Sequence, residues 1–341
     1  MKRAVILFNL GGPNRLESVE PFLFNLFNDP AIIGIPSFLR YPLAKFISKR
    51  RAPITKNIYR KIGNKSPILE LTEQQAKSLE ENLLKKGDYK CFIVMRCWHP
   101  RASEVIKKVK EYNPEEIILL PLYPQFSATT SGSSIGEWNK LCKKENYLIK
   151  TKTICCYPTE NNFIASHVSL IKKTLSILEN NNFKLIFSAH GLPESKIKKG
   201  DPYQWHVEET VKEIMLKLNN ENLDHVISYQ SRVGLLKWIG PSTDEEIVKY
   251  SKEKKGIIIV PVAFVSEHSE TLVELDIEYK KLADKNGCSF YKRVPALGSD
   301  ENFIKGLAEL VLQPQKKGNF ISSIICPNKF VKCPSLDVSA N

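Results

Sequence analysis

The chain has 341 residues, of which 42% are hydrophobic and 26% charged, and its formal net charge is +13. This length suits two domains of roughly 150 residues each, and no apolar run approaches the ~20 residues that span a bilayer, which argues against an integral membrane protein. The positive charge favours an anionic partner but does not choose between nucleic acid, acidic lipid and an acidic substrate. Because dispersed lysines supply much of it and no nucleic-acid-binding module has its signature here, we expect no nucleic-acid partner.

The cysteines and the start of the chain bear on the cellular compartment. Eight cysteines are scattered without a tight framework, which favours reduced thiols in a cytosol over disulfides. Glycine and proline interrupt the first apolar run before a signal-peptide core could form, so we interpret that run as a β-strand. We therefore expect a cytoplasmic bacterial protein.

Short β-branched runs alternate with longer amphipathic stretches along most of the chain. The predicted strands are residues 4–10, 91–95, 116–120, 148–155, 184–188, 225–229, 256–262 and 289–294. The predicted helices are residues 19–27, 70–86, 102–112, 163–179, 204–218, 243–254, 269–285 and 302–312. This alternation predicts an α/β fold in which helices cover both faces of parallel sheets.

The eight strands divide into two sets of four near residue 155. We therefore expect two Rossmann-like domains, each a four-stranded parallel sheet flanked by helices, over residues 1–155 and 156–315, followed by a tail over residues 316–341. Residues 32–65 stand outside the alternation because they are rich in proline, aromatic and basic residues. This segment is either a lip that caps a cleft or rests on anionic lipid, or a plain surface helix.

In parallel sheets of this type, ligands bind beyond the carboxyl ends of the strands. The residues that follow the predicted strands are rich in aromatic, imidazole and acidic side chains. His190 ends an apolar strand, precedes a Gly-Leu-Pro turn, and carries an imidazole whose ordinary pKa near 6.5 suits proton exchange. A histidine after a strand is more often a packing residue, but this combination makes His190 the candidate base.

A row of glutamates follows the strand predicted over residues 256–262. Glu267, Glu270, Glu274 and Glu278 are spaced by three, four and four residues, which would place them on one face of a helix. For Glu278 we accept the simpler interpretation of a solvated position. The first three should project into the cleft between the domains, where mutual repulsion would raise their pKa values and suit them to proton uptake.

Strong metal and nucleotide motifs are absent from the sequence. There is no His-Glu-x-x-His and no Cys-x-x-Cys pair, and Cys326 and Cys333 give only a weak hint of a metal site. The glycines at residues 11–12 lack the spacing of a dinucleotide loop, and no Gly-Lys-Ser or Gly-Lys-Thr phosphate loop occurs. We therefore expect no nucleotide cofactor.

Several segments, in order along the chain, resemble the signatures of the ferrochelatase family. They are residues 9–13, 123–125, 188–193, 229–234, 238–241 and 264–272. The similarity extends from about residue 4 to residue 312, and an ordered set of this length is far more specific than any one member. The resemblance implies a chelatase-like fold and a lyase of haem and porphyrin biosynthesis that inserts Fe²⁺ into protoporphyrin IX, gives protohaem and releases two protons.

The same resemblance implies roles for individual residues. His190 would abstract pyrrole protons or handle metal, and Glu270 would face it across the porphyrin; these two are also the expected metal contacts. The proton or metal path would be completed by His268, Glu274 and Glu267. The macrocycle pocket would be lined by Leu10, Tyr59, Arg96, Tyr123, Trp238 and Phe264. The porphyrin propionates would be held by Arg51, Ser66 and Ser231.

The sequence also departs from the family pattern. Leu10 stands where other members place Met or Tyr on the ring, and Glu267 stands where they have an aspartate. Members with an iron–sulfur cluster use several cysteines in a C-terminal extension and one after the Tyr-Pro-Gln turn, a position that corresponds to Ala128 here. Because only Cys326 and Cys333 stand near the end and a two-iron cluster normally needs four ligands, we expect no cluster and no permanently bound cofactor.

Residues 40–51 resemble the lip that membrane-associated members rest on lipid. The resemblance favours peripheral contact with the inner face of the cytoplasmic membrane, and it favours protoporphyrin over coproporphyrin as substrate.

The mechanism expected from the sequence combines ring bending with proton transfer. Apolar walls would bend the macrocycle, while His190 accepts protons on one face and Glu270 and Glu274 pass charge or metal on the other. The opposite assignment, in which protons leave on the Glu270 and Glu274 face and metal enters on the His190 face, stays open. Two alternatives remain: a chelatase for coproporphyrin or sirohydrochlorin, and a non-catalytic haem carrier in which His190 is an axial ligand.

Overall fold

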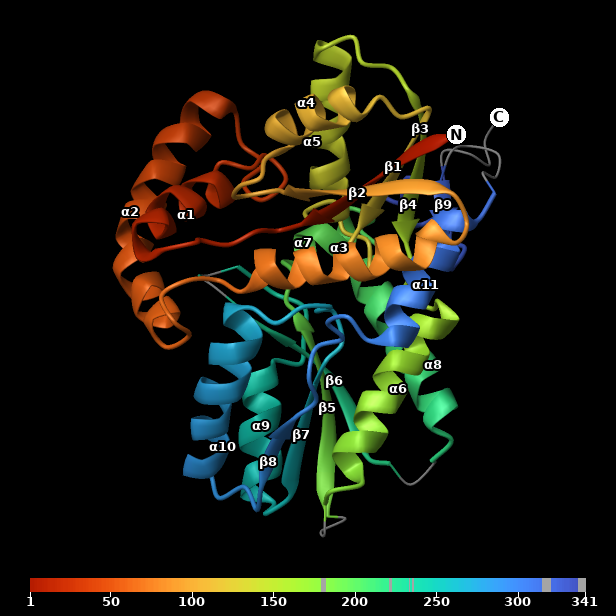
Figure 1. Ribbon diagram of the computed structural model, residues 1–341. Helices are drawn as coiled ribbons and strands as arrows, with labels where there is room; N and C mark the ends of the chain where they lie inside the picture. The colour runs from red at the N-terminus through yellow and green to blue at the C-terminus, as the bar shows by residue number, and fades with distance from the viewer. Residues whose placement is uncertain (179–181, 221–222, 233, 235, 315–319, 337–341) are drawn as a thin grey trace.

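The computed structural model describes residues 1–178, 182–220, 223–232, 234, 236–314 and 320–336 and contains two parallel β-sheets flanked by helices (Figure 1). The first sheet has the strand order β2-β1-β3-β4-β9. Its strands are β1 (Lys2–Asn9), β2 (Asp88–Met95), β3 (Glu116–Pro121), β4 (Lys150–Cys156) and β9 (Phe320–Ser322). The second sheet has the order β6-β5-β7-β8. Its strands are β5 (Phe183–His190), β6 (His225–Gln230), β7 (Gly256–Pro261) and β8 (Tyr291–Arg293).

Helices surround both sheets. Those of the N-terminal lobe are η1 (Leu16–Ser18, a 3₁₀ turn), α1 (Val19–Phe27), α2 (Ser37–Arg60), α3 (Ile68–Leu84), α4 (Ala102–Tyr112) and α5 (Ser131–Lys144). The later ones are α6 (Asn161–Leu175), α7 (Glu194–Lys198), α8 (Tyr203–Leu218), α9 (Thr243–Lys252), the π-helix η2 (Glu270–Tyr279), α10 (Lys280–Lys285) and α11 (Glu301–Leu312). Within the described ranges, no helix combines the length and apolar character needed to cross a bilayer.

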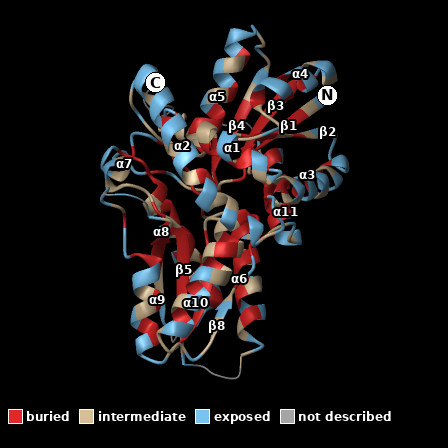
Figure 2. Ribbon diagram, turned by 90° about the vertical axis from the view of Figure 1, so that its left-hand side faces the viewer, coloured by how far each residue is buried: buried red, intermediate tan, exposed pale blue. Residues whose placement is uncertain are grey.

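The central strands are buried on both faces, as their apolar composition predicts. β7 reads Gly-Ile-Ile-Ile-Val-Pro and is buried along its whole length, which is typical of a parallel strand covered by helices on both sides. Buried residues accordingly concentrate in the strands and on the inward helix faces (Figure 2). In the second sheet, His190 pairs in register with Gln230, so the carboxyl ends of β5 and β6 lie side by side.

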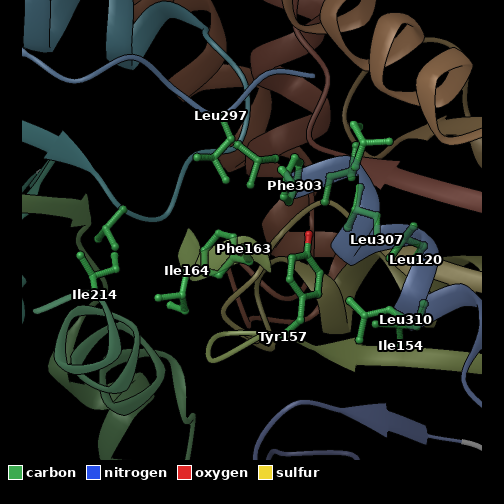
Figure 3. Packing of buried hydrophobic residues seen from close by; sticks show 14 of the residues in the cluster. Leu120, Ile154, Tyr157, Phe163, Ile164, Ile214, Leu297, Phe303, Leu307 and Leu310 are labelled. Carbon is green, nitrogen blue, oxygen red and sulfur yellow. The ribbon is translucent and has the colours of Figure 1, made fainter. Parts of the chain in front are cut away.

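One continuous hydrophobic core joins the two lobes. It combines Leu120 and Ile154 of the first sheet with Ile214 of α8 and Phe303 of α11 (Figure 3). Phe303 is 1% exposed, and its ring centroid lies 6.3 Å from that of Phe163 in α6. Because this core contains residues of both sheets and of the helices between them, the two lobes are packed against each other.

The fold class is confirmed, but the first sheet has five strands instead of the expected four. β9, from the segment expected to be a tail, pairs with β4 in parallel through Thr153 with Phe320 and Ile154 with Ile321. A three-residue strand is too short to produce a periodic signal in the sequence, which is why it escapes prediction. The domain boundaries near residue 155 stay predictions, and part of the expected tail lies outside the described residues.

Some helices also differ from the expectation. Residues 32–65 form mainly the long helix α2, which contains Pro42 and Pro53, residues that usually interrupt helices. The helices α5 and α7 were not predicted, and α5 starts with Ser-Gly-Ser-Ser, residues of low helix propensity. The helix predicted over residues 269–285 is divided into η2 and α10. Residue 179 at the end of another predicted helix, and Val233 in a recognised motif, lie outside the described residues.

Candidate active site

His190 ends β5 and faces Glu270, the first residue of η2. The Nε2 atom of His190 lies 3.7 Å from Oε1 of Glu270, and the two side chains are 39% and 27% exposed. The Nδ1 atom lies 2.7 Å from the carbonyl oxygen of Gly191. Since a carbonyl oxygen only accepts hydrogen bonds, Nδ1 carries the hydrogen in the neutral ring and Nε2 has a free lone pair. The imidazole can therefore accept a proton on the side where Glu270 lies.

Glu270 contacts a second imidazole. The Nε2 atom of His268 lies 3.5 Å from Oε2 of Glu270, and the His268 ring packs against Phe264 with 4.6 Å between centroids. Burial alone would raise the pKa of Glu270, but the charges of His190 and His268 outweigh burial and lower that pKa to about 2. Charged imidazoles beside Glu270 therefore favour its ionised form.

This arrangement does not fit the expected sandwich of a porphyrin between His190 and Glu270. A flat ring in contact with a group on each face needs about 7 Å between those groups, twice an ordinary contact distance, whereas 3.7 Å separates Nε2 from Oε1. The two side chains therefore form one pair that can approach a ring from a single face.

Four donors hold the carboxylate of Glu274. Its Oε1 accepts from the backbone N–H of Ser231 and from the hydroxyl of Tyr279, both at 3.0 Å. Its Oε2 accepts from the Ser231 hydroxyl at 2.6 Å and from Nε2 of Gln230 at 3.1 Å. Burial raises the pKa of Glu274, and the nearby charge of Glu270 adds to the rise. The predicted raised pKa is thus confirmed for Glu274.

The predicted raised pKa is wrong for Glu267 and for Glu270. Oε1 of Glu267 accepts from Arg293 Nη1 at 2.8 Å and from the backbone N–H of Ala296 at 3.0 Å. Burial would raise the pKa of Glu267, but the Arg293 guanidinium reverses this and lowers it. Glu278 pairs with Lys61 at 3.1 Å and is 48% exposed, in line with its simpler interpretation as a solvated position.

Comparison with known proteins identifies the family of the chain. The profile described as Ferrochelatase matches residues 2–315. The chain belongs to the ferrochelatase family. It is 63% identical to the ferrochelatase of Pelagibacter ubique (strain HTCC1062) over 344 residues, covering 99% of both chains. It is 53% identical to the ferrochelatase of Rickettsia felis, covering 97% of both.

Solved structures show the same fold at much lower sequence identity. SirB from Bacillus subtilis with Fe³⁺ superposes with a TM-score of 0.53 at 12% identity, covering 91% of this chain and 94% of SirB. The sirohydrochlorin chelatase SirB from Bacillus subtilis subspecies spizizenii in complex with cobalt gives a TM-score of 0.50 at 10% identity, covering 91% and 93%. These likenesses support the chelatase-like fold expected of a ferrochelatase.

Tyr59 and Trp238, two residues that the ferrochelatase resemblance places in the pocket, lie close to the sequence neighbours of Glu270 and His190. The Tyr59 hydroxyl lies 3.5 Å from that of Ser269, next to Glu270 in sequence, and burial raises the pKa of Tyr59 to about 12. Trp238 packs on the turn after His190, because a Cβ added at Gly191 would lie 3.3 Å from its ring. A Cβ there would also lie 2.9 Å from the Gln230 carbonyl oxygen, so this turn requires glycine.

Other residues assigned by that resemblance are engaged elsewhere. The guanidinium of Arg96 pairs with Asp29 at 2.9 Å and with Glu137 at 3.0 Å, which leaves its side chain 12% exposed. Ser66 is buried against Gly12, where an added Cβ would lie 2.5 Å from the serine hydroxyl. Ser231, assigned to a propionate, donates to Glu274 instead. Pocket roles for these three residues stay predictions.

The last three residues assigned by the resemblance, Leu10, Arg51 and Tyr123, belong to the N-terminal lobe. Leu10 packs at the edge of the cluster that contains Tyr59. The guanidinium carbon of Arg51 lies 5.9 Å from the centroid of the Phe27 ring. Tyr123 packs against the core cluster that contains residues of β1 and β3, and its burial raises the pKa of its hydroxyl. Their contacts with a porphyrin stay predictions.

Sequence reasoning missed several residues that hold the site. Gln230 and Tyr279 both donate to Glu274, and Arg293 binds Glu267 and Asp276. Gln230 ends β6 and lies in a strand-end segment that the sequence analysis singled out, residues 229–234, but it was given no role there. Arg293 and Tyr279 give no local signal, because their partners are set by the tertiary packing of β8 and η2.

Two surface hollows of about 590 and 430 Å³ lie along α1 and α2 instead of at this pair. Their walls include Glu20, Lys56 and Tyr41. None of the lining residues is a predicted site residue, so the hollows do not coincide with the candidate active site.

A second group of reactive side chains is also brought together. Cys155 and Cys156 at the end of β4 meet Cys326 and Cys333 of the C-terminal segment. The expectation of no iron–sulfur cluster depended on Ala128 at the position of one family cysteine and on only two cysteines near the end of the chain; this grouping does not test it, and it stays a prediction.

Proposed function

We propose that this chain inserts ferrous iron into protoporphyrin IX to give protohaem, with release of two protons, as the last step of haem biosynthesis. Its membership of the ferrochelatase family supports the activity of a metal-chelating lyase with Fe²⁺ and a porphyrin as substrates. The observation that carries the catalytic assignment is the 3.7 Å contact between Nε2 of His190 and Oε1 of Glu270.

His190 acts as the base. A free porphyrin holds two N–H protons, and each must leave before its nitrogen can bind iron. Nε2 of His190 takes the proton, since Nδ1 already donates to Gly191, and the electron pair of the broken N–H bond stays on nitrogen to bind iron. Glu270, whose pKa is lowered by charge on His190 and His268, stabilises the imidazolium that forms.

His268 and Glu274 extend this pair into a row along which protons leave the pocket. His268 contacts Glu270 directly, and the raised pKa of Glu274 suits it to accept and release protons. Metal movement along the same row is the alternative, because imidazoles and carboxylates also bind divalent metals. Glu267 does not carry protons in this row, because its carboxylate is already paired with Arg293. Its role is to support the structure around the row.

The walls of the pocket bend the porphyrin so that its nitrogens are exposed. Tyr59, Trp238 and Phe264 are placed to supply aromatic contacts around the pair, and Leu10 adds an aliphatic contact from the other lobe. Binding energy used in this way lowers the barrier to metal insertion. Arg51 offers a cation to a propionate, whereas Arg96 acts through the acidic partners that it holds.

None of these steps needs a resident cofactor, so we infer that Fe²⁺ enters the active site only as substrate. The two domains proposed on either side of residue 155 each supply one wall of the pocket. We expect no nucleic-acid partner, because the positive charge comes from dispersed lysines.

We also propose that α2 rests on an anionic membrane surface, at the cytoplasmic side. Its buried residues Ala44, Ser48 and Ala52 recur every four positions and face the protein. Large apolar side chains are exposed on the rest of the helix: Phe38, Leu39, Tyr41, Leu43, Phe46 and Ile54. Exposed cations stand among them at Lys45, Lys49 and Arg50. An apolar surface with interspersed cations suits the boundary between lipid headgroups and acyl chains.

Anaerobic mixing with ferrous iron and protoporphyrin IX tests the function. Many turnovers of haem per chain are expected from the optical spectrum of the product. A haem carrier would stop at one equivalent, and a chelatase for another tetrapyrrole would prefer coproporphyrin or sirohydrochlorin when the substrates compete. Either of these results would overturn the proposal.

A further inference from the structure

Gln75 of α3 is a buried polar residue whose side chain bonds to the C-terminal lobe. It is 0% exposed. Its Nε2 atom donates to the carbonyl oxygens of Val265 at 3.1 Å and of Gly298 at 2.8 Å. Its Oε1 atom accepts from the hydroxyl of Ser266 at 3.1 Å. Because α3 runs between the two sheets (Figure 1), this one amide ties the N-terminal lobe to two loops of the other lobe.

The partners fix the orientation of the Gln75 amide. Carbonyl oxygens only accept hydrogen bonds, so the amide atom beside Val265 and Gly298 is the nitrogen, and each of its two hydrogens has one acceptor. The amide oxygen is then the atom that accepts from the Ser266 hydroxyl. A flipped amide would place its oxygen against two carbonyl oxygens, so a single orientation satisfies all three bonds.

The two loops that Gln75 holds are also bonded to each other. One loop, residues 262–269, connects β7 to η2, and the other, residues 294–300, connects β8 to α11. The backbone N–H of Gly298 in the second loop donates to the carbonyl oxygen of Val265 in the first at 2.9 Å. The second loop therefore braces the first, and Gln75 braces both from the opposite lobe.

Ser266 carries the connection from Gln75 to the imidazole of His268. Its hydroxyl bonds to Gln75, and its own carbonyl oxygen lies 3.2 Å from Nδ1 of His268. Since a carbonyl only accepts, Nδ1 carries a hydrogen, and Nε2 is the nitrogen that faces Oε2 of Glu270 at 3.5 Å. Oε1 of Glu270 in turn lies 3.7 Å from Nε2 of His190. A series of contacts therefore runs from α3 to the proposed base.

Gln75 has no access to a substrate, because it is fully buried, whereas the side chains of His190 and Glu270 are 39% and 27% exposed. Burial of an amide costs free energy unless its hydrogen bonds are made. An apolar side chain would fill the same space beside the core residues Ala76 and Leu79 without that cost. The three directed bonds thus do more than packing requires.

We propose that Gln75 is a positioning residue for metal insertion: through Ser266 it holds the ring of His268 against Glu270. This inference rests on the proposed function, in which His268 and Glu270 help protons to leave the pocket. A displacement of about 1 Å in such a group can slow a reaction ~100-fold. The N-terminal lobe therefore contributes to proton transfer in the C-terminal lobe without touching the porphyrin.

The variant Gln75→Met tests the proposal, because methionine is similar in length to glutamine but donates no hydrogen bond. We expect kcat for haem formation from Fe²⁺ and protoporphyrin IX to fall about 10- to 100-fold, while KM for the porphyrin stays close to the wild-type value because no pocket contact is lost. Gln74→Met, at the exposed neighbouring position of α3, is the matched control and should leave both constants unchanged.

Turnover per folded chain separates positioning from a purely structural role. Each variant is assayed at a temperature at which its circular dichroism shows it to be folded. A lower melting temperature of Gln75→Met with unchanged kcat per folded chain would show that the residue only stabilises the fold, and it would overturn the proposal.

The variant Ser266→Ala breaks the connection at its second link and leaves the bonds from Gln75 to the two carbonyls in place. We expect kcat to fall here too. The double variant Gln75→Met, Ser266→Ala should lose no more than Gln75→Met alone, because both changes break the same connection. Losses that multiply would show that the two residues act independently and would contradict the proposal. If Gln75→Met does not fold, an unchanged kcat in Ser266→Ala would contradict it as well.

Nuclear magnetic resonance of the chain labelled with nitrogen-15 histidine observes the His268 ring without any substrate. The hydrogen on its Nδ1 is bonded to Ser266, so its signal should be protected from exchange with water. The variant His268→Gln identifies this signal by its absence. Gln75→Met and Ser266→Ala should weaken the signal, and Gln74→Met should keep it.

These results distinguish a failure of this inference from a failure of the proposed function. A wild type that forms no haem contradicts the proposed function. An unchanged His268 signal in Gln75→Met contradicts the positioning role of Gln75, whichever tetrapyrrole the chain uses.

Discussion

His190 and Glu270 link the carboxyl end of β5 to the first turn of η2 through a 3.7 Å contact between imidazole and carboxylate. Protonation of the ring turns this contact into an ion pair. The position of the π-helix therefore determines how well the imidazolium is stabilised, and residues that hold this helix are expected to influence turnover without touching the porphyrin.

The variant His190→Ala removes the proposed base. We expect kcat to fall by about 10²- to 10⁴-fold, the usual contribution of a positioned acid or base, while the dissociation constant of protoporphyrin stays within a few-fold of the wild-type value. Fluorescence quenching measures binding, and haem formation measures turnover. His225→Ala is the control. His225 begins β6, whereas the site lies at the carboxyl end of that strand, so this variant should leave kcat and the dissociation constant unchanged. Normal turnover in His190→Ala would refute the assignment.

The ion pair between Glu267 and Arg293 is expected to stabilise the fold in a pH-dependent way. The pKa of Glu267 is lowered in the folded state, so the pair contributes stability above the unfolded pKa of ~4.3 and loses it as the pH falls through the folded pKa. Glu267→Gln should lower the free energy of unfolding by ~1–3 kcal/mol at pH 7, and the difference should shrink below about pH 4.

Urea unfolding at several pH values measures this difference. Glu278→Gln is the control: Glu278 is 48% exposed and pairs with exposed Lys61, so its loss should change the free energy by less than ~0.5 kcal/mol. A pH-independent effect of Glu267→Gln would show that Arg293 does not hold an ionised carboxylate there.

The comparison of sequence with structure shows which features are encoded locally. Buried parallel strands such as β7 and amphipathic helices such as α4 carry their pattern within a few residues, and the strand-end rule led to His190. The π-helix was invisible because its glutamate spacing also fits an α-helix. The low pKa values of Glu267 and Glu270 depend on Arg293, His190 and His268, which the chain brings close only by folding.

The group of buried cysteines at the end of β4 and in the C-terminal segment illustrates the same limit. Cys155 and Cys326 are separated by the whole second sheet along the chain, and their proximity depends on β9, a strand of three residues. Motif spacing therefore pointed only to Cys326 and Cys333. Side chains gathered by sheet pairing have no fixed spacing in sequence, so a search for motifs cannot find such a group.

Removing one donor to Glu274 should shift the pH dependence of turnover. The hydroxyl of Tyr279 lowers the pKa of Glu274, so Tyr279→Phe should raise that pKa, because the ionised carboxylate loses one hydrogen bond. If the ionised carboxylate accepts protons, the acidic limb of the kcat profile moves to higher pH. Tyr250→Phe in α9 is the control and should leave the profile in place.

The apolar face of α2 is expected to bind anionic lipid. Phe38 and Phe46 are 74% and 63% exposed, and burying each ring in a membrane would contribute ~1.5–3 kcal/mol. Phe38→Ser together with Phe46→Ser should therefore weaken binding to phosphatidylglycerol-containing vesicles at least ~10-fold in a sedimentation assay, with haem formation from detergent-solubilised porphyrin unchanged.

A control variant tests whether the position of the apolar residues matters. Leu148 and Ile177 are 82% and 68% exposed, away from α2, so Leu148→Ser with Ile177→Ser removes comparable apolar surface and should leave vesicle binding intact. Since Lys45, Lys49 and Arg50 stand among the apolar side chains, binding should also weaken as salt rises or as neutral lipid replaces anionic lipid. Equal losses in the two double variants would mean that α2 is not the contact surface, because the effect would then follow total exposed apolar area instead of one helix.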